Sequence, residues 1–214
     1  MKHFLMRSNL ALLLLFTLNT ATAIAQVESS TQTNTSAPST RALRVYFAGG
    51  SGFTKPSGEF NDAINSYVSV DGRVNASGVL ELPGVFVKKT PHLWLGLLPS
   101  LVAEEYSSNY SQETTIALTH FNLDASAFWF LNADRAEGVL FRLDAGYTYL
   151  HRFERIALVD FDRYYNGMNM KASVGYALRG FSEAGFWSFN LGLFAVSAGA
   201  IQETGGDFTV GIML

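Results

Sequence analysis

The stretch FRLDAGYTYL, residues 141–150, places Arg142 and Asp144 in a run of otherwise apolar and aromatic side chains. Successive side chains of a β-strand point to opposite faces, so the two charges share one face while Phe141 and Leu143 share the other. A strand of a soluble barrel turns its apolar face inward, whereas a strand of a membrane barrel turns it toward lipid. The stretch therefore predicts a strand, and the decisive question is which face points outward.

The same alternation recurs from residue 42 onward, interrupted by clusters of turn residues. The connections after the second, fourth and sixth strands are short, and the others are mostly longer, including a predicted loop over 153–167. Short turns at one end and long loops at the other are typical of outer-membrane barrels. Pro99 predicts a bend or a register change in the third strand. The alternation predicts eight strands, at 43–53, 78–88, 92–107, 114–131, 139–152, 168–180, 186–197 and 206–214.

The polar face of these strands is narrow, with glycine, serine and a few charges of both signs. The outer face of a soluble barrel is usually rich in Lys and Glu, so we expect this face to line a lumen. Charges in a lumen that side chains fill are expected to pair and brace the barrel. A narrow pore or a proton path is the alternative role for the same charges. The predicted charge network comprises Arg44, Asp124, Arg142, Asp144, Lys171 and Arg179.

The aromatic residues provide a separate indication. Trp129 and Trp187 fall near the short-turn end of their predicted strands, and Tyr147 and Tyr149 fall near the other end. Two such belts at the membrane interfaces are typical of membrane barrels. Trp94 is the exception, because its position along the strand places it on the lumen side.

The N-terminal 41 residues carry other signals. Residues 1–25 combine a positive start, an apolar run and a small-residue cleavage site, which predicts an export signal peptide. Residues 26–41 are rich in Ser, Thr, Gln and Asn, and we expect a disordered tail. The chain has no cysteine, so disulfides and thiolate metal sites are excluded. The remaining residues, 42–214, form the predicted barrel domain, and the absence of long charge runs argues against a nucleic-acid partner.

The first long connection has a helical pattern. In residues 55–70, Phe60, Ile64 and Tyr67 recur at helical spacing. We expect a short helix that folds into or over the barrel mouth, or an ordinary exposed loop helix. Lumen-side glycines, among them Gly146 and Gly175, would make room for it.

Candidate chemistry is sparse. His92, His120 and His151 lie on different predicted strands without metal-ligand spacing, so we expect no metal site and no cofactor. A nucleophile needs a base within reach, and His120 is too far from Ser126 along one strand for a hydrogen bond. We therefore expect no catalytic residues and no enzyme. A lipid A-modifying enzyme with a histidine and a serine at the outer rim is kept as an alternative.

These features resemble the small eight-stranded outer-membrane barrels, the OmpA/OmpX-like class. The resemblance rests on strand count, loop asymmetry, the segments DAGYTYL and SVGYAL, and the last strand. In that strand Phe208, Val210 and Ile212 alternate up to Leu214, where the family usually ends in phenylalanine. The resemblance implies an all-β, antiparallel up-and-down transmembrane barrel, inserted by the barrel assembly machinery.

The resemblance also implies a place and a role. We expect export and insertion into the outer membrane of a Gram-negative cell, with lipid and lipopolysaccharide as partners and the chain as a monomer. The expected role is structural or surface interaction, with the lumen filled by paired charges. The alternative binding function is a lipocalin-like barrel for an apolar ligand, which requires Phe141, Leu143 and Tyr147 to point inward.

Overall fold

The computed structural model describes residues 43–67, 73–108, 114–132, 137–156, 159–180 and 185–214. The predicted signal peptide (1–25) and Ser/Thr-rich tail (26–41) lie outside the described residues.

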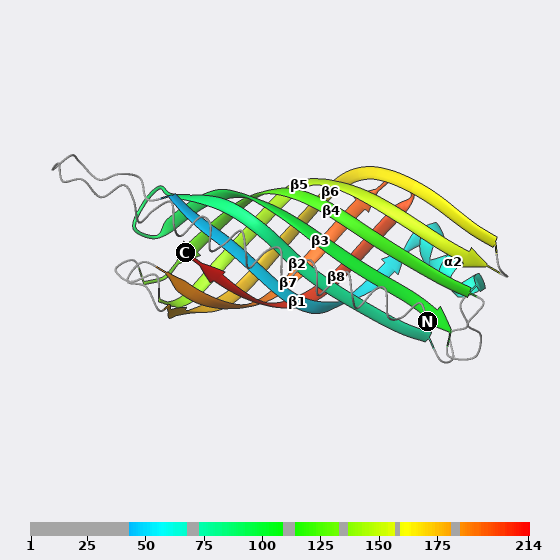
Figure 1. Ribbon diagram of the computed structural model, residues 1–214, viewed down its shortest axis with the longest axis horizontal. Coiled ribbons are helices and arrows are strands. Elements are labelled where there is room, and N and C mark those ends of the chain that lie inside the picture. Colours follow the sequence, from blue (N-terminus) through cyan, green and yellow to red (C-terminus); the bar gives the residue numbers. More distant parts are fainter. Residues whose placement is uncertain (1–42, 68–72, 109–113, 133–136, 157–158, 181–184) are drawn as a thin grey trace. The chain divides into compact units, whose positions relative to one another are not determined.

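The described strands form one closed antiparallel barrel in which each strand pairs with the next in sequence and β1 pairs with β8 (Figure 1). The predicted eight-stranded up-and-down barrel is confirmed. Closure leaves no strand edge unpaired, which is the condition for β-structure to cross a membrane. The strands are β1 (Leu43–Ser57), β2 (Arg73–Lys88), β3 (Leu93–Ser108), β4 (Thr114–Phe130), β5 (Gly138–Ile156), β6 (Val159–Arg179), β7 (Phe186–Ala198) and β8 (Ile201–Met213).

The strand that contains FRLDAGYTYL shows which face points outward. In β5, Leu143 is 62% exposed, whereas Arg142 and Asp144 are 2% and 3% exposed. The exposed apolar run of β5 extends from Val139 to Tyr149, roughly 33 Å along a strand and roughly 25 Å in height at barrel tilt. That height equals the apolar band of an outer-membrane barrel. The barrel therefore has a polar, charged interior and an apolar exterior.

The two ends of the barrel differ. The connections at 89–92, 131–137 and 180–185 mark one end, here called the turn end. The opposite end, here called the hairpin end, carries the extended strands β5 and β6 at the right of Figure 1.

The predicted long loop over 153–167 is wrong. β5 continues to Ile156 and β6 begins at Val159, and the two pair along this whole length. β7 and β8 are likewise separated only by residues 199–200. In residues 159–164 of β6 both faces are exposed, so the period-2 pattern fades there although the backbone ladder continues. The asymmetry between the ends is thus carried by long strands as much as by loops.

Two prolines, Pro83 in β2 and Pro99 in β3, lie near an irregularity in the pairing. Between Glu81 and Val85, β2 has one residue more than the facing stretch of β3, and it also has an extra residue against β1. Proline lacks the donor that a ladder needs, and a bulge accommodates it. β3 pairs with β4 without a shift. The register change expected at Pro99 is therefore wrong, because the extra residue belongs to β2.

The first connection contains α2 (Gly58–Tyr67), so the short predicted helix is confirmed. Phe60 and Ile64 lie one helical turn apart and are fully buried against side chains of the barrel interior. The helix lies at the hairpin end (Figure 1). The described residues include no helix that is long and apolar enough to cross a membrane.

The sequence suggested that lumen glycines make room for α2, but Gly146 and Gly175 do not. A Cβ on Gly146 would lie 2.3 Å from Asp124 Oδ1, and one on Gly175 would lie 2.3 Å from Asn190 Oδ1. These glycines instead make room for polar side chains of the adjacent strands.

Candidate functional site in the barrel lumen

Apolar clusters lie in the lumen on both sides of a polar middle. Near the turn end, the rings of Tyr46, Phe86 and Phe128 meet edge to face, with centroids 5.0 to 6.0 Å apart. Near the hairpin end, Phe60 and Ile64 of α2 pack into the second cluster. Small barrels have interiors just wide enough for side chains to fill. The first cluster comprises Tyr46, Ala48, Phe86, Trp94, Leu98, Phe128, Phe130, Leu140, Ala177, Phe186 and Met213, and the second comprises Phe60, Ile64, Tyr106, Ile116, Leu118, Leu150, Val196, Ala198 and Ile201.

A network of ion pairs lies between the clusters. Arg142 contacts Glu81 at 2.7 Å and Asp144 at 2.7 Å. Lys171 contacts Glu81 at 3.0 Å and Asp207 at 2.7 Å. All five side chains are at most 11% exposed, and Glu81, Asp144 and Asp207 each have a cationic partner within contact distance. Breaking such a buried pair leaves an uncompensated charge, which costs about 3–5 kcal/mol.

The structure gathers some of the predicted network and not the rest. Arg142, Asp144 and Lys171 lie together, and Asp124 lines the same cavity. Arg44 and Arg179 form no ion pair with any described residue, and Arg179 is exposed near the turn end.

The sequence reasoning missed Glu81 and Asp207, the acids that join the network. Glu81 lies beside the bulge in β2, where alternation is weak, and Asp207 lies near the start of a predicted strand. Both occupy inward positions, and an acidic residue at such a position was the available signal.

The predicted aromatic residues lie on the outer wall. Trp129, Tyr147 and Tyr149 are exposed, and Trp187 is half-buried. Trp94 points inward and is 5% exposed, in agreement with its position along the strand.

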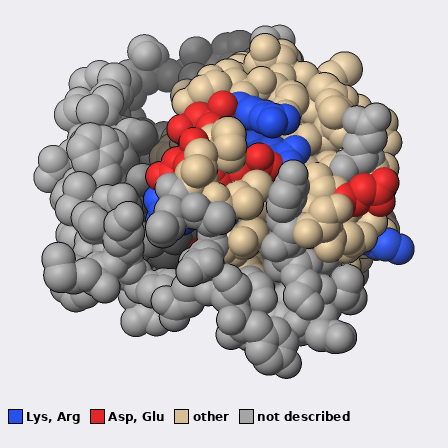
Figure 2. All heavy atoms as spheres, turned by 90° about the vertical axis from the view of Figure 1, so that its right-hand side faces the viewer, with Lys and Arg blue, Asp and Glu red and all other residues tan. Residues whose placement is uncertain are grey.

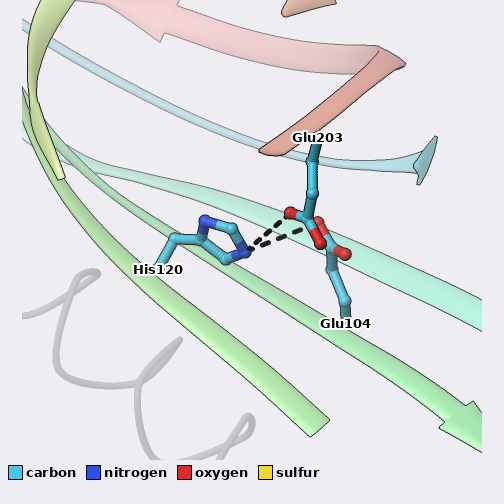
Figure 3. Close-up of side chains that lie close together, drawn as sticks. All are labelled: Glu104, His120 and Glu203. Atoms are coloured by element: carbon cyan, nitrogen blue, oxygen red, sulfur yellow. Dashed lines mark ion pairs between the residues drawn. The ribbon is translucent and has the colours of Figure 1, made fainter. Parts of the chain in front are cut away.

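A second charged cluster lies closer to the hairpin end. Glu104 of β3, His120 of β4 and Glu203 of β8 point toward one another across the lumen (Figure 3). His120 Nε2 lies 3.7 Å from Glu104 Oε1 and 3.4 Å from Glu203 Oε2. The three side chains are at most 1% exposed. The described residues place no Lys or Arg within ion-pair distance of either carboxylate, unlike the first network.

Neighbouring hydroxyl groups fix the orientation of Glu104. The Tyr106 hydroxyl donates a hydrogen bond to Glu104 Oε2 at 3.0 Å and lies 2.7 Å from Thr54 Oγ1. The ring of Tyr106 also meets Phe60 of α2 edge to face at 6.2 Å. Glu104 Oε1 is thereby left to face His120, and the helix covers the cluster through Tyr106.

Four atoms of this cluster have no hydrogen-bond partner among the described residues: Glu104 Oε1, His120 Nε2, and both carboxylate oxygens of Glu203. Buried polar atoms are normally paired, so this concentration marks a site that a ligand could complete. A cavity of about 40 Å³ adjoins it, lined by Glu104 and His120 and also by Arg142 and Lys171. That volume holds a few water molecules or a small ion.

The sequence reasoning considered His120 and did not find its partners. Metal-ligand spacing along the chain is a local signal, whereas these ligands come from three strands. Glu203 also fell in a segment interpreted as a loop, because β8 was predicted to begin at residue 206.

The extended β5–β6 hairpin carries a separate set of charges outside the apolar band. Arg155 donates two hydrogen bonds to Asp160, at 2.6 and 2.8 Å, and these raise the pKa of Arg155 above its ordinary value. His151 lies 2.6 Å from Asp162 and stacks on Tyr164. Figure 2 shows charged side chains of both signs gathered at this end of the molecule.

No protein-family model matches the chain, and no curated protein sequence matches it. Solved structures do match. Ail, the attachment invasion locus protein of Yersinia pestis, has a TM-score of 0.51 with 9% identity, covering 80% of this chain and 97% of that one. The same protein in complex with the heparin analogue sucrose octasulfate has a TM-score of 0.51 with 8% identity over the same shares.

The chain has the fold of the small eight-stranded outer-membrane barrels. The resemblance noted in the sequence is thus confirmed at the level of fold. Identity this low leaves function to the residues of this chain.

Proposed function

We propose that this protein is an outer-membrane barrel with a structural or surface-interaction role, and that its lumen is closed to diffusion. The observation that carries the proposal is the orientation of the two faces of β5: the apolar face with Leu143 points outward and the charged face with Arg142 points inward. Exposing such a continuous apolar band to water would be unfavourable, whereas lipid accepts it.

The interior supports a closed barrel. A solute passing along the lumen would meet the aromatic cluster near the turn end and α2 near the hairpin end. Between them, the Arg142 and Lys171 ion pairs cross the lumen. We therefore propose that the charges brace the wall and that the barrel acts as a monomer.

The exposed hairpin supports the surface role. Val159, Phe161 and Tyr164 are 53%, 44% and 59% exposed beyond the apolar band, beside the Arg155–Asp160 pair. Exposed aromatic and charged side chains on a rigid ladder are suited to contact lipopolysaccharide or a partner at the cell surface. Insertion by the barrel assembly machinery and export by residues 1–25 belong to the same proposal.

The two alternatives from the sequence have less support. A lipocalin-like site required Phe141, Leu143 and Tyr147 to point inward, and they are exposed on the outer wall. A lipid A-modifying enzyme would need a histidine that reaches lipid. His120 is buried in the lumen, and His151 is held by Asp162 on the hairpin. We therefore propose no enzymatic activity.

Fractionation tests the location and cysteine labelling tests the orientation. The protein is expected in the outer-membrane fraction, as a fast band in unboiled SDS that shifts on boiling. Because the chain has no cysteine, Val159→Cys can be labelled with an impermeant maleimide on intact cells, with Lys89→Cys at the turn end as the matched control. We expect Val159→Cys alone to react. Protein in the soluble fraction, or reaction of Lys89→Cys alone, would contradict the proposal.

A further inference from the structure

The structure assigns a metal-binding site to Glu104, His120 and Glu203, and we propose that its ligand is a divalent first-row transition-metal ion such as Zn²⁺. This site goes beyond the proposed surface role and is independent of it. The candidate ligand atoms all lie within 4.8 Å of one another, and all three residues are buried.

The spacing of the ligand atoms fits a small metal ion. Four ligands at about 2.1 Å around a tetrahedral Zn²⁺ lie about 3.4 Å from one another. The observed separations from His120 Nε2 are 3.4 Å to Glu203 Oε2 and 3.7 Å to Glu104 Oε1. A metal ion at the centre of these atoms needs only small side-chain adjustments.

The missing partners point the same way. His120 Nε2 is buried, aimed at both carboxylates, and without a hydrogen bond among the described residues (Figure 3). Once ionised, the two carboxylates carry two negative charges beside a neutral imidazole, and a divalent cation balances them. In the neighbouring network Glu81, Asp144 and Asp207 each contact Arg142 or Lys171, so the ion-pair network has no need of a metal.

The donor set selects the class of metal. An imidazole nitrogen with two carboxylates suits Zn²⁺ and its first-row neighbours, whereas Ca²⁺ prefers six to eight oxygen ligands at longer distances. Tyr106 holds Glu104 through its other oxygen, as outer partners commonly orient metal ligands. The adjoining cavity of about 40 Å³ provides space for a water as fourth ligand.

The bound ion would cross-link β3, β4 and β8 beneath α2. We assign it a structural role because it is enclosed inside the barrel and its ligands come from strands that are not all neighbours in the wall. It would stabilise the barrel wall near the hairpin end, as the Arg142 ion pairs stabilise the middle of the barrel.

The test uses the full chain refolded from urea into detergent, with Zn²⁺, Co²⁺, Mg²⁺ or Ca²⁺ added in separate samples. We expect one equivalent of Zn²⁺ per chain, a visible Co²⁺ spectrum typical of low coordination number, and no competition by Mg²⁺ or Ca²⁺. A folded barrel, shown by its heat-shifted band, that binds no Zn²⁺ would overturn the proposal, as would equal binding of Ca²⁺.

Variants assign the site. Glu203→Gln and His120→Gln keep the side-chain volume and are expected to weaken Zn²⁺ binding at least about 100-fold, and Tyr106→Phe about tenfold. His151→Gln is the matched control, since it removes a histidine–carboxylate pair on the hairpin, and it should leave binding unchanged. Unchanged affinity in a folded Glu203→Gln barrel, or loss in His151→Gln, would contradict the assignment. None of these readouts depends on cellular location, so failure here leaves the proposed function standing.

Discussion

The lumen holds two charged clusters that differ in how their buried carboxylates are partnered. Around Arg142, each buried carboxylate contacts a guanidinium or ammonium group. Around His120, two buried glutamates face an imidazole, and the described residues supply no Lys or Arg. The comparison teaches that burial alone does not distinguish a brace from a binding site. What distinguishes a brace from a binding site is whether neighbouring side chains supply a cation to the carboxylates, and variants can test that difference.

The largest effect is expected from removing the central cation. Arg142→Met leaves Glu81 and Asp144 buried without their main partner, and we expect a loss of about 3–5 kcal/mol in the free energy of unfolding. Urea titration of the folded barrel in lipid or detergent measures it. Arg179→Met, at an exposed site at the end of β6, should change stability by less than about 0.5 kcal/mol. Equal effects of the two variants would show that the network does not brace the barrel.

The second-largest effect is expected from α2, the helix that covers the second cluster. Phe60→Ala removes a fully buried ring packed against Tyr106, and we expect a cost of about 3 kcal/mol, because the remaining cavity is only partly refilled. Asp62→Ala on the exposed side of α2 is the control. Thermal unfolding followed by circular dichroism compares the two. If Phe60→Ala behaved like its control, α2 would not be a stable cover of the lumen.

The two clusters should respond differently to neutralisation of one acid. With a chelator present, Glu203→Gln replaces a buried carboxyl group that has no Lys or Arg partner among the described residues, so it should not destabilise the barrel. With Zn²⁺ at about 100 times its dissociation constant, the parent protein gains about 2.7 kcal/mol that the variant lacks. Glu81→Gln should destabilise under both conditions, because it removes the carboxylate that Arg142 and Lys171 share. A Glu203→Gln effect of the same sign with and without Zn²⁺ would remove the contrast.

The smallest effect is expected on the hairpin. Arg155→Ala breaks an ion pair with good geometry, yet its groups are exposed and screened by water and salt. We expect no measurable change in the unfolding midpoint, at low or at high salt. A loss comparable with that of Arg142→Met would mean that the hairpin is buried against something in the folded state.

The sequence was sufficient for the barrel and insufficient for the site. Alternation in FRLDAGYTYL identified Arg142 and Asp144 as lumen residues, because period-2 patterning records which face of a strand is buried. It failed over 153–167, because residues 159–164 are exposed on both faces and leave no pattern to mark the strand. It could not find Glu104 and Glu203 as partners of His120, because strand register and barrel closure decide which side chains meet across a lumen.

The most direct test of the account is the environment of Leu143, the outward neighbour of the two charges in FRLDAGYTYL. A nitroxide attached at Leu143→Cys in liposomes should be accessible to oxygen and shielded from a water-soluble nickel complex. The same label at Tyr164→Cys on the hairpin should be accessible to nickel. That result would place the apolar face of β5 in lipid. Equal access of the nickel complex to both labels would show that this face meets water, and the membrane barrel proposed here would be wrong.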